Sequence, residues 1–362
     1  MVDAGIGYRE SQSPSGSNHE NLINDNQPWL MMAVKDKTMG DSKVLWTDQE
    51  IYTDENIFAA EQARIFKNIW MPVCHESELP EPYDFRTSSL ANENILVCRA
   101  ADQKINAFLN VCPHRGMLIE RRPQGTFLEG QESGNPKRIT CMFHAWQFDM
   151  RGNCVYVARE KEGYQDRFSK DEAGLRRLRC EVDFGGFVWV SLCDQPPVAL
   201  REWLMEPSKH LLSAISSEPL EVFSYRKSIL NSNYKQAHDD LIGLHTAFIN
   251  SENADGNGRP GVEIRREHFG YGHAVAGTFV NDNERLDPPT EDSLFPGLVA
   301  NDWFLLDLFP GYTFSVYGAS LNMTTITPLS PREVMVEYRG LGLQSDSEES
   351  REQRVRQYNS IW

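Results

Sequence analysis

The pattern of apolar and polar positions becomes regular only after a long polar start. Residues 1–45 are rich in Ser, Asn, Gly and Asp and show no periodicity. Because such a composition supplies little apolar surface to bury, we expect a flexible N-terminal tail. From Trp46 onward the apolar residues recur every three or four positions as far as Trp70. That spacing predicts a helix over 53–70.

Short apolar or alternating runs, each closed by turn residues, follow this helix. They lie at 95–98, 105–111, 139–142, 155–157 and 187–192. Regular short strands of this kind predict a small antiparallel sandwich or barrel. The Pro196-Pro197 pair then predicts a boundary. We therefore expect a tail over 1–45, a first domain over 46–195 and a second domain over 196–362.

The second domain mixes the two periodicities. Helices are predicted over 200–215 and 234–249, and strands over 221–229, 304–308, 313–317 and 334–338. Ser345-x-x-Glu348 has the form of a capping box, so a charged helix is expected to begin there, with Val355, Tyr358 and Trp362 on one face. Because the chain stops within this helix, we expect the domain to be incomplete at its C-terminus. The whole pattern predicts an α+β protein.

Charge and hydropathy exclude two classes of partner. The chain has 52 Asp and Glu against 36 Lys and Arg, a net charge of -16, which would repel a phosphate backbone. The longest apolar stretch, 184–192, is too short to span a bilayer, and the polar N-terminus has no signal-peptide core. We therefore expect a cytoplasmic protein that binds neither nucleic acid nor membrane.

Two Cys–His pairs carry the clearest chemical signal. Cys112 and His114 form a C-x-H motif, and Cys141 and His144 form a C-x-x-H motif, each after a predicted strand. Two such loops would bring two thiolates and two imidazoles together. This donor set fits a tetrahedral zinc ion, or a Rieske cluster in which two cysteines hold one iron and two histidines hold the other. The remaining cysteines are expected to be buried free thiols: Cys74, Cys98, Cys154, Cys180 and Cys193.

The residues around the pairs favour the cluster. Cys-Pro-His-Arg-Gly at 112–116 and Cys-Met-Phe-His-Ala-Trp at 141–146 resemble the Rieske domain of aromatic-ring-hydroxylating oxygenases. The resemblance extends from about Val44 to the end and is greatest to the large (alpha) subunits of anthranilate 1,2-dioxygenases. It implies a Rieske antiparallel β-sandwich, followed by a helix-grip catalytic domain with a central antiparallel sheet. It also implies a [2Fe-2S] cluster held by Cys112, His114, Cys141 and His144.

The same resemblance implies a mononuclear Fe(II) held by two histidines and one carboxylate. The helix that would carry the first ligands begins at Asn233-Tyr234-Lys235. His245 is the best candidate for a first ligand, and Asp240 is the candidate for the acid that bridges to a neighbouring cluster. The chain departs from the family pattern at Ile242, where that acid usually lies, and at Asn250, near where the second histidine is expected. The third ligand is expected beyond Trp362.

The other histidines are expected to be structural. His238 lies seven residues before His245, which is two helical turns or about 10 Å along the axis, so both cannot hold one ion unless the helix breaks. The apolar residues Leu241, Leu244 and Phe248 fit a pocket lining and a packed core equally well. The remaining histidines have no ligand-like spacing: His19, His75, His210, His268 and His273.

The resemblance implies an oxidoreductase of aromatic catabolism. Electrons from NAD(P)H would arrive through a reductase and a Rieske ferredoxin, and O₂ would be used to dihydroxylate an aromatic acid, anthranilate giving catechol. Subunits would form a trimer, with or without a small subunit. Three alternatives stay open: a hydroxylase of another aromatic acid such as salicylate or a halobenzoate, an electron-transfer or degenerate Rieske protein without the mononuclear iron, and a zinc-stabilised binding module.

Overall fold

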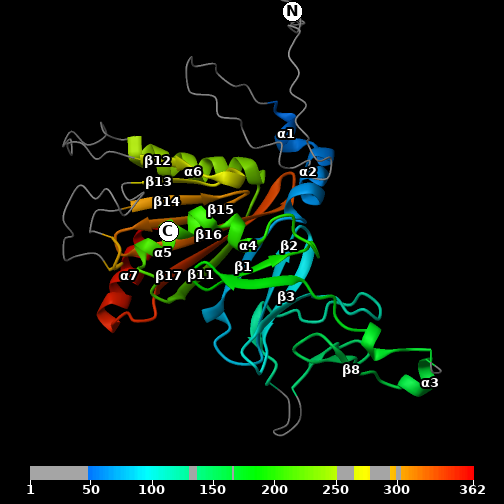
Figure 1. Ribbon diagram of the computed structural model, residues 1–362. Helices are drawn as coiled ribbons and strands as arrows, with labels where there is room; N and C mark the ends of the chain where they lie inside the picture. Colours follow the sequence, from blue (N-terminus) through cyan, green and yellow to red (C-terminus); the bar gives the residue numbers. More distant parts are fainter. Residues whose placement is uncertain (1–47, 130–136, 165–166, 251–264, 278–293, 299–302) are drawn as a thin grey trace, which may run out of the picture.

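The computed structural model describes residues 48–129, 137–164, 167–250, 265–277, 294–298 and 303–362 (Figure 1). Within α6, the side chains of residues 243–250 are not described. The predicted tail at 1–45 lies outside the described residues. Among the described residues, none of the helices has the length and apolar character that crossing a bilayer requires.

The described strands form four antiparallel sheets. Their orders are β1-β10-β9, β4-β3-β2-β5, β6-β7-β8 and β11-β17-β16-β15-β14-β13-β12. The helices are α1 Glu50–Thr53, α2 Glu55–Glu61, α3 Glu160–Tyr164, α4 Leu200–Trp203, α5 Met205–Ala214, α6 Tyr234–Asn250 and α7 Glu348–Ile361. The strands are β1 Met71–His75, β2 Asp84–Leu90, β3 Glu93–Arg99, β4 Ile105–Leu109, β5 Gln124–Thr126, β6 Ile139–Thr140, β7 Gln147–Phe148, β8 Cys154–Tyr156, β9 Arg179–Asp183, β10 Phe187–Ser191, β11 Leu220–Leu230, β12 Arg265–His268, β13 Ala274–Gly277, β14 Trp303–Leu308, β15 Tyr312–Tyr317, β16 Ser320–Ser330 and β17 Glu333–Leu343.

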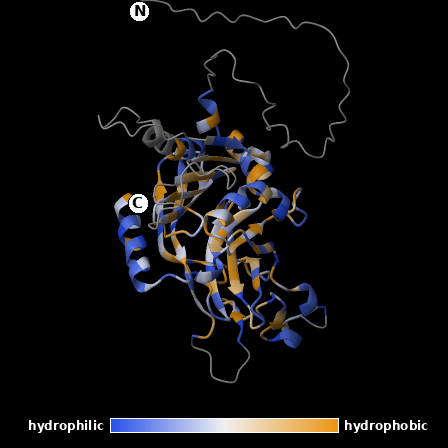
Figure 2. Ribbon diagram, turned by 60° about the vertical axis from the view of Figure 1, so that its left-hand side comes forward, coloured by the Kyte–Doolittle hydropathy of each residue, from blue (hydrophilic) through white to orange (hydrophobic). Residues whose placement is uncertain are grey.

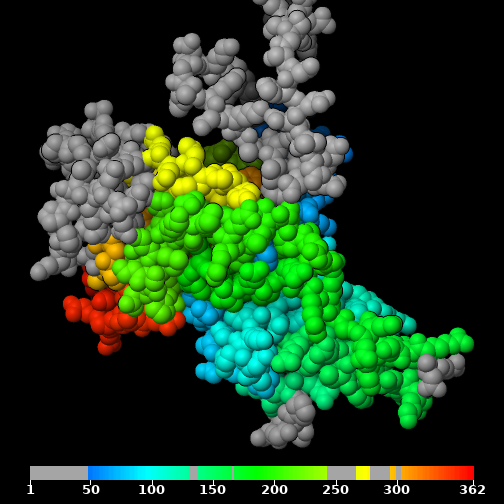
Figure 3. Space-filling view, in the orientation of Figure 1, coloured from blue at the N-terminus to red at the C-terminus, as the bar shows by residue number. Residues whose placement is uncertain are grey.

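The first half of the chain contains a module that begins and ends at neighbouring strands. β1 pairs with β10, with His75 opposite Phe187, and the Glu76 N–H donates to the Gly186 carbonyl at 2.8 Å. Residues 76–186, which we call the Cys–His module, contain the two small sheets β4-β3-β2-β5 and β6-β7-β8. They have a core of their own around Phe85, Phe108 and Phe148. In the space-filling view the cyan to blue-green part of this module projects from the body of the molecule (Figure 3).

The seven-stranded sheet of the second half packs on both faces. On one face, Phe314 of β15 meets Phe184 and Phe187 with ring centroids 5.0 and 5.1 Å apart. The other face is covered by α6 and α7. His238 of α6 lies 2.7 Å from Asp307 of β14, and Tyr358 of α7 donates its hydroxyl to Asn322 of β16 at 3.2 Å. In Figure 2 the strands are largely apolar in colour, whereas α7 is hydrophilic on its outer side. The sheet is therefore a layer between the first half and the two helices.

A buried carboxylate ties the two halves together. Glu78 Oε2 accepts a hydrogen bond from Arg339 Nε of β17 at 3.0 Å, and Glu78 Oε1 forms an ion pair with Arg86 of β2. Arg339 also donates to the Val73 carbonyl of β1 at 3.0 Å. Burial alone would raise the pKa of Glu78, but the charges of Arg339 and Arg86 outweigh burial and lower the pKa. The carboxylate is therefore ionised where the Cys–His module meets the large sheet.

The predicted α+β class is confirmed, whereas two predicted helices are wrong in their bounds. The helix expected over 53–70 is broken at Asp54, which is extended and whose carboxylate accepts the N–H groups of Asn56 and Ile57 to cap α2. A π-helical turn at 62–66 then ends the helical stretch well before Trp70. Similarly, the helix expected over 200–215 divides at Leu204, whose backbone leaves the α region. In both places a local backbone break overrides the apolar periodicity.

The predicted capping box is also displaced. Ser347, and not Ser345, caps α7, since its hydroxyl accepts the Ser350 N–H at 3.1 Å. The Ser345 hydroxyl instead donates to Glu218 at 3.3 Å. Two predicted strands are shorter than expected. The strand expected over 105–111 ends at Leu109 as β4, and the one expected over 139–142 ends at Thr140 as β6. The periodicity did not identify β1, β2, β9 or β16.

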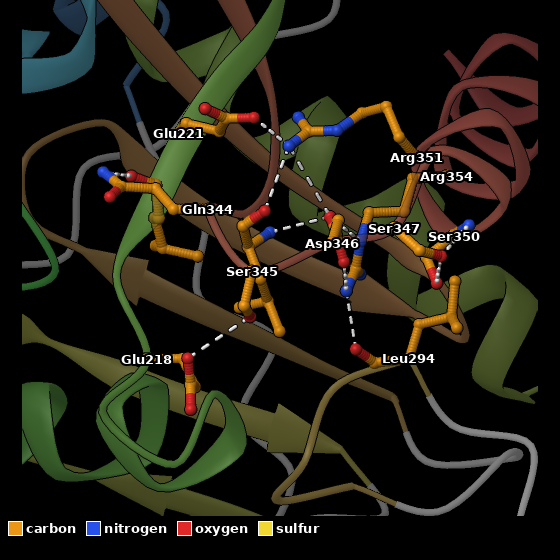
Figure 4. Close-up of polar contacts among 12 residues, drawn as sticks. Glu218, Glu221, Leu294, Gln344, Ser345, Asp346, Ser347, Ser350, Arg351 and Arg354 are labelled. Carbon is orange, nitrogen blue, oxygen red and sulfur yellow. Dashed lines mark hydrogen bonds and ion pairs between the residues drawn. The ribbon is translucent and has the colours of Figure 1, made fainter.

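Helix α7 is held by a fully buried arginine, which sequence periodicity placed among polar positions. Arg354 donates from Nε and Nη2 to Asp346 at 2.7 and 2.9 Å, and from Nη1 and Nη2 to the carbonyls of Ala319 and Leu294 at 3.0 and 2.6 Å (Figure 4). Its guanidinium carbon lies 4.1 Å from the centre of the Phe295 ring. One side chain thus joins α7 to β16 and to the 294–298 segment.

We expect Arg354→Met to lower the free energy of unfolding by about 3–5 kcal/mol, because the buried Asp346 carboxylate would lose its closest cation. Urea unfolding followed by circular dichroism measures the change. The matched control is Arg356→Met on the same helix, where an exposed i,i+4 pair with Glu352 is lost. That control should change stability by less than about 0.5 kcal/mol. Equal effects of the two substitutions would contradict the assignment of Arg354 as the anchor.

Candidate functional site

The two Cys–His motifs fold into two equivalent loops. In the first, the Cys112 N–H donates to the Met117 carbonyl at 2.8 Å, and the Cys112 carbonyl accepts the Gly116 N–H at 2.9 Å. In the second, the Cys141 N–H donates to the Trp146 carbonyl at 2.9 Å, and the Cys141 carbonyl accepts the N–H four residues later at 3.0 Å. Both loops therefore present a cysteine at their base and a histidine near their tip.

The structure brings the four predicted ligands together. Cys112 and Cys141 are buried, and their thiols are neighbours. Burial raises the pKa of Cys112 to about 11, and the adjacent Cys141 adds to the rise, so a thiolate here needs a bound cation. The ring centroids of His114 and His144 lie 4.7 Å apart, and both residues are half-buried. Burial, together with the nearby charges of His144 and Arg115, lowers the pKa of His114, which favours the neutral imidazole that binds metals.

These four side chains form two pairs of like donors. Two buried thiols lie at the loop bases and two imidazoles lie side by side toward the surface, which is the donor set of a Rieske cluster. The residues present thus fit a [2Fe-2S] group.

Aromatic side chains surround His114. Trp146 stacks on its ring at 4.8 Å with the two planes 8° apart, and the Tyr164 hydroxyl lies 3.3 Å from His114 Nε2. Phe168 packs against both Trp146 and Tyr164. Sequence reasoning did not identify Tyr164 as part of the site, because it lies 50 residues from His114 and in no motif with it.

The second candidate site is helix α6, whose start is firmly anchored. Asn233 is buried, its Oδ1 accepts the Lys235 N–H at 3.0 Å, and its amide nitrogen donates to the carbonyls of Tyr52 and Pro331 at 2.9 Å each. The ammonium of Lys235 pairs with Glu61 of α2 at 2.8 Å. The predicted start of this helix at 234 agrees with the structure.

His238 is tied to the large sheet. Its Nε2 lies 2.7 Å from Asp307 Oδ1 on β14. Burial alone would lower the pKa of His238, but the hydrogen bond and charge of Asp307 outweigh burial and raise the pKa. The expectation that His238 is structural agrees with this contact. Asp307, which lies 69 residues away, could not be paired with it from the sequence.

The other predicted residues of α6 are only partly described. Asp240, the candidate bridging acid, and its neighbour Asp239 are exposed. Leu241 is half-buried and packs against the main core. The side chains of His245 and Asn250 lie outside the described residues, so their expected roles stay predictions.

The sheet face that α6 and α7 cover carries a row of buried hydroxyls. Thr313 pairs with Asp307 across β14 and β15, and Ser315 pairs with Asn322 across β15 and β16, so all four share the face that meets the helices. Among the described residues, the Thr313 and Ser315 hydroxyls have no hydrogen-bond partner. A buried hydroxyl without a partner costs about 1–3 kcal/mol, so this face is suited to a polar group. The alternation of Thr313 and Ser315 with apolar residues was the signal that sequence reasoning missed.

The remaining cysteines and histidines largely match their expected environments. Cys74, Cys98 and Cys154 are buried free thiols, whereas Cys180 and Cys193 are only half-buried, which corrects the expectation for these two. Among the histidines outside the motifs, His75 and His273 are buried, His210 is half-buried and His268 is exposed. His19 lies outside the described residues.

Comparisons with known proteins agree with this geometry. The family model of the Rieske [2Fe-2S] domain matches residues 69–169. The chain is 53% identical over 320 residues to the methanesulfonate monooxygenase hydroxylase subunit alpha of Methylosulfonomonas methylovora, covering 88% of this chain and 77% of the relative. It is 34% identical over 327 residues to the 2-aminobenzenesulfonate 2,3-dioxygenase subunit alpha of an Alcaligenes species, covering 88% and 79%.

The expected resemblance to anthranilate dioxygenases is present but weaker. The anthranilate 1,2-dioxygenase large subunit of Acinetobacter baylyi is 26% identical over 354 residues, covering 87% of this chain and 72% of the relative. Among solved structures, naphthalene 1,2-dioxygenase from a Rhodococcus species superimposes with a TM-score of 0.71 at 19% identity, covering 86% of this chain and 76% of that chain. This structural likeness supports the fold, and the two relatives of higher identity are named for sulfonates.

The two loops allow a direct test of backbone strain. Gly116 and Ala145, each four residues after a cysteine, both have left-handed φ angles, of 70° and 55°. We expect Gly116→Ala to lower the free energy of unfolding by about 1–2 kcal/mol, because only the backbone conformation opposes the new methyl group, which has no atom within 4 Å. Ala145→Gly should raise it by up to about 1 kcal/mol. Urea unfolding of the cluster-loaded protein measures both, and changes of the same sign would contradict this reading of the loops.

The His238–Asp307 pair predicts a pH-dependent stability. Because the pKa of His238 is raised, the pair contributes fully below the ordinary histidine pKa of about 6.5, and its contribution is lost as pH rises through the raised pKa. Asp307→Asn should therefore lower the free energy of unfolding by about 1–3 kcal/mol near pH 6, and by less at pH 9. Urea unfolding at both pH values measures this. Asp171→Asn, at an exposed aspartate in the first half of the chain, is the control. A deficit for Asp307→Asn that grows with pH would contradict the prediction.

Proposed function

We propose that this chain, which belongs to the family of Rieske oxygenase alpha subunits, is the oxygenase component that hydroxylates an organosulfonate. As a member of this family it is an oxidoreductase. The observation that carries the choice of substrate class is the 53% identity to a methanesulfonate monooxygenase subunit over 320 residues. A second relative, at 34% identity, also acts on a sulfonate according to its name.

We further propose that Cys112, His114, Cys141 and His144 hold the Rieske cluster. The buried thiols and the adjacent imidazoles support this assignment. The cluster, when bound, supplies single electrons for oxygen activation. The protein loops keep the thiols away from water and leave the imidazoles near the surface.

Members of this family carry a mononuclear iron in the catalytic domain, and we propose His245 of α6 as one of its ligands. Asp240 remains the proposed bridging acid, and its exposure would let it meet a neighbouring subunit. The anchoring of α6 through Asn233 and through the His238–Asp307 contact supports a fixed position for this helix over the sheet. A rigid helix is what positions a ligand precisely enough for oxygen chemistry.

The polar face of the large sheet supports a polar substrate. Thr313 and Ser315 would offer hydroxyl donors to sulfonate oxygens, and Asp307, already paired with His238, would keep its charge partly neutralised. An apolar aromatic ring would leave these hydroxyls unpaired. Aromatic sulfonates are the second candidate class, favoured by the 34% identical relative.

Alpha subunits of this family act with O₂ and electron-transfer partners and assemble as multimers. We propose that a reductase and a Rieske ferredoxin deliver electrons from NAD(P)H to this chain, in the cytoplasm, within a trimer that has or lacks small subunits. Hydroxylation of methanesulfonate at carbon would consume one O₂, two electrons and two protons, placing one oxygen atom in the product and releasing the other as water. The hydroxymethanesulfonate formed would dissociate to formaldehyde and hydrogen sulfite.

The test uses the full chain purified without oxygen, reconstituted with ferrous iron, and supplied with electrons through a reductase and ferredoxin. We expect methanesulfonate to stimulate O₂ uptake, with formaldehyde and sulfite formed in amounts equal to the O₂ consumed, because binding near iron couples electron delivery to hydroxylation. Gas chromatography of derivatised formaldehyde and ion chromatography of sulfite measure the products.

Cys112→Ser serves as the control that lacks a cluster ligand, and it should give no substrate-dependent product. Coupled turnover of 2-aminobenzenesulfonate with none of methanesulfonate would move the assignment to aromatic sulfonates. Catechol from anthranilate, with no product from either sulfonate, would reject the sulfonate proposal.

A further inference from the structure

The two imidazoles at the proposed cluster have different surroundings. The ring of His114 is stacked on Trp146, and its Nε2 lies 3.3 Å from the Tyr164 hydroxyl. The ring of His144 contacts Phe143 at 4.0 Å and His114 at 4.7 Å. Across the described part of the chain, no hydrogen bond joins the His144 ring to another residue. One imidazole is therefore held by a polar contact and the other is not.

Packing places the Tyr164 hydroxyl. Tyr164 is the last residue of α3 and is half-buried. Its ring lies 4.8 Å from Phe168 and 6.1 Å from Trp146, and Phe168 in turn meets Trp146 at 5.2 Å. Because Trp146 also stacks on His114, the three aromatic rings and the imidazole form one packed unit. Packing of the rings thus holds the hydroxyl beside Nε2.

We infer that Tyr164 is a positioning residue for the cluster ligand His114, an inference that rests on the proposed cluster ligands. With Nε2 facing the hydroxyl, the proton of the neutral ring would lie on Nε2 and be donated to the Tyr164 oxygen. Nδ1 would then be the nitrogen left for iron. A hydrogen bond from the outer nitrogen of a ligand histidine fixes its tautomer and makes the ligand more electron-rich.

An electron-rich ligand favours the oxidised form of an iron–sulfur cluster. Hydrogen bonding around a cluster is one of the features that set its reduction potential. The Tyr164 contact therefore lowers the potential relative to a cluster whose histidines are both without this bond. It also makes the two histidines inequivalent, since His144 has no such contact among the described residues.

The test is Tyr164→Phe, which keeps the ring packing and removes only the hydroxyl. We expect the equilibrium for one-electron reduction to shift about threefold to tenfold toward the reduced cluster, which is about 30–60 mV upward at 59 mV per tenfold. Protein-film voltammetry measures the potential, and the visible spectrum verifies that the cluster is bound. Tyr156→Phe, at an exposed tyrosine of the same module, is the matched control and should leave the potential unchanged. An unchanged or lower potential in Tyr164→Phe would overturn the inference.

A second measurement compares the wild-type protein with Tyr164→Phe. In ¹⁵N-histidine-labelled protein with the oxidised cluster, we expect the substitution to speed the solvent exchange of one ligand N–H, since that N–H loses its bond to Tyr164. Unchanged exchange at both histidines would also overturn the inference. A wild-type protein without the electron paramagnetic resonance signal of a reduced Rieske cluster would reject the proposed function instead, so the two failures are distinguishable.

Discussion

The position of every candidate site depends on one buried ion network. Glu78 lies between Arg339 of the large sheet and Arg86 of the Cys–His module, and Arg339 also holds the backbone of β1 at Val73. Removing charges from water is costly unless each finds a well-placed partner, and here the carboxylate finds two guanidinium groups and the N–H of His75 at 2.7 Å. Because this arrangement has few equivalent alternatives, it fixes how the module meets the sheet. The two Cys–His loops belong to the module on one side of that junction, and α6 packs on the sheet on its other side.

The two candidate sites differ in how far they could be predicted from the sequence. The four proposed cluster ligands could be predicted because each loop is a short local unit, in which a few backbone hydrogen bonds place a thiol and an imidazole together. They are Cys112, His114, Cys141 and His144. The fold class also followed from periodicity, since strands and helices leave different apolar spacings. A site whose residues lie close together in the sequence can therefore be predicted from the sequence.

Long-range contacts could not be read in this way. The pairing of His238 with Asp307, the burial of Arg354 and the approach of Tyr164 to His114 each join residues that are distant in sequence or that look like surface positions. The predicted helix over 53–70 failed for a related reason, because an Asp54 side chain that caps the backbone competes with helix continuation. The resemblance in the sequence motifs pointed to anthranilate dioxygenases, whereas the relatives of higher identity are named for sulfonates.

The adjacency of β1 and β10 has an evolutionary consequence. Since His75 lies opposite Phe187, the two ends of the Cys–His module lie on neighbouring antiparallel strands. A segment with neighbouring ends can be inserted into a host fold, or exchanged for another, without altering the path of the host backbone. The Cys–His module of this protein has the form of such an inserted segment. Substitutions that change the reduction potential of the module can then accumulate independently of substitutions that change the substrate preference of the sheet. The Glu78 junction constrains both, because it holds the module against the sheet.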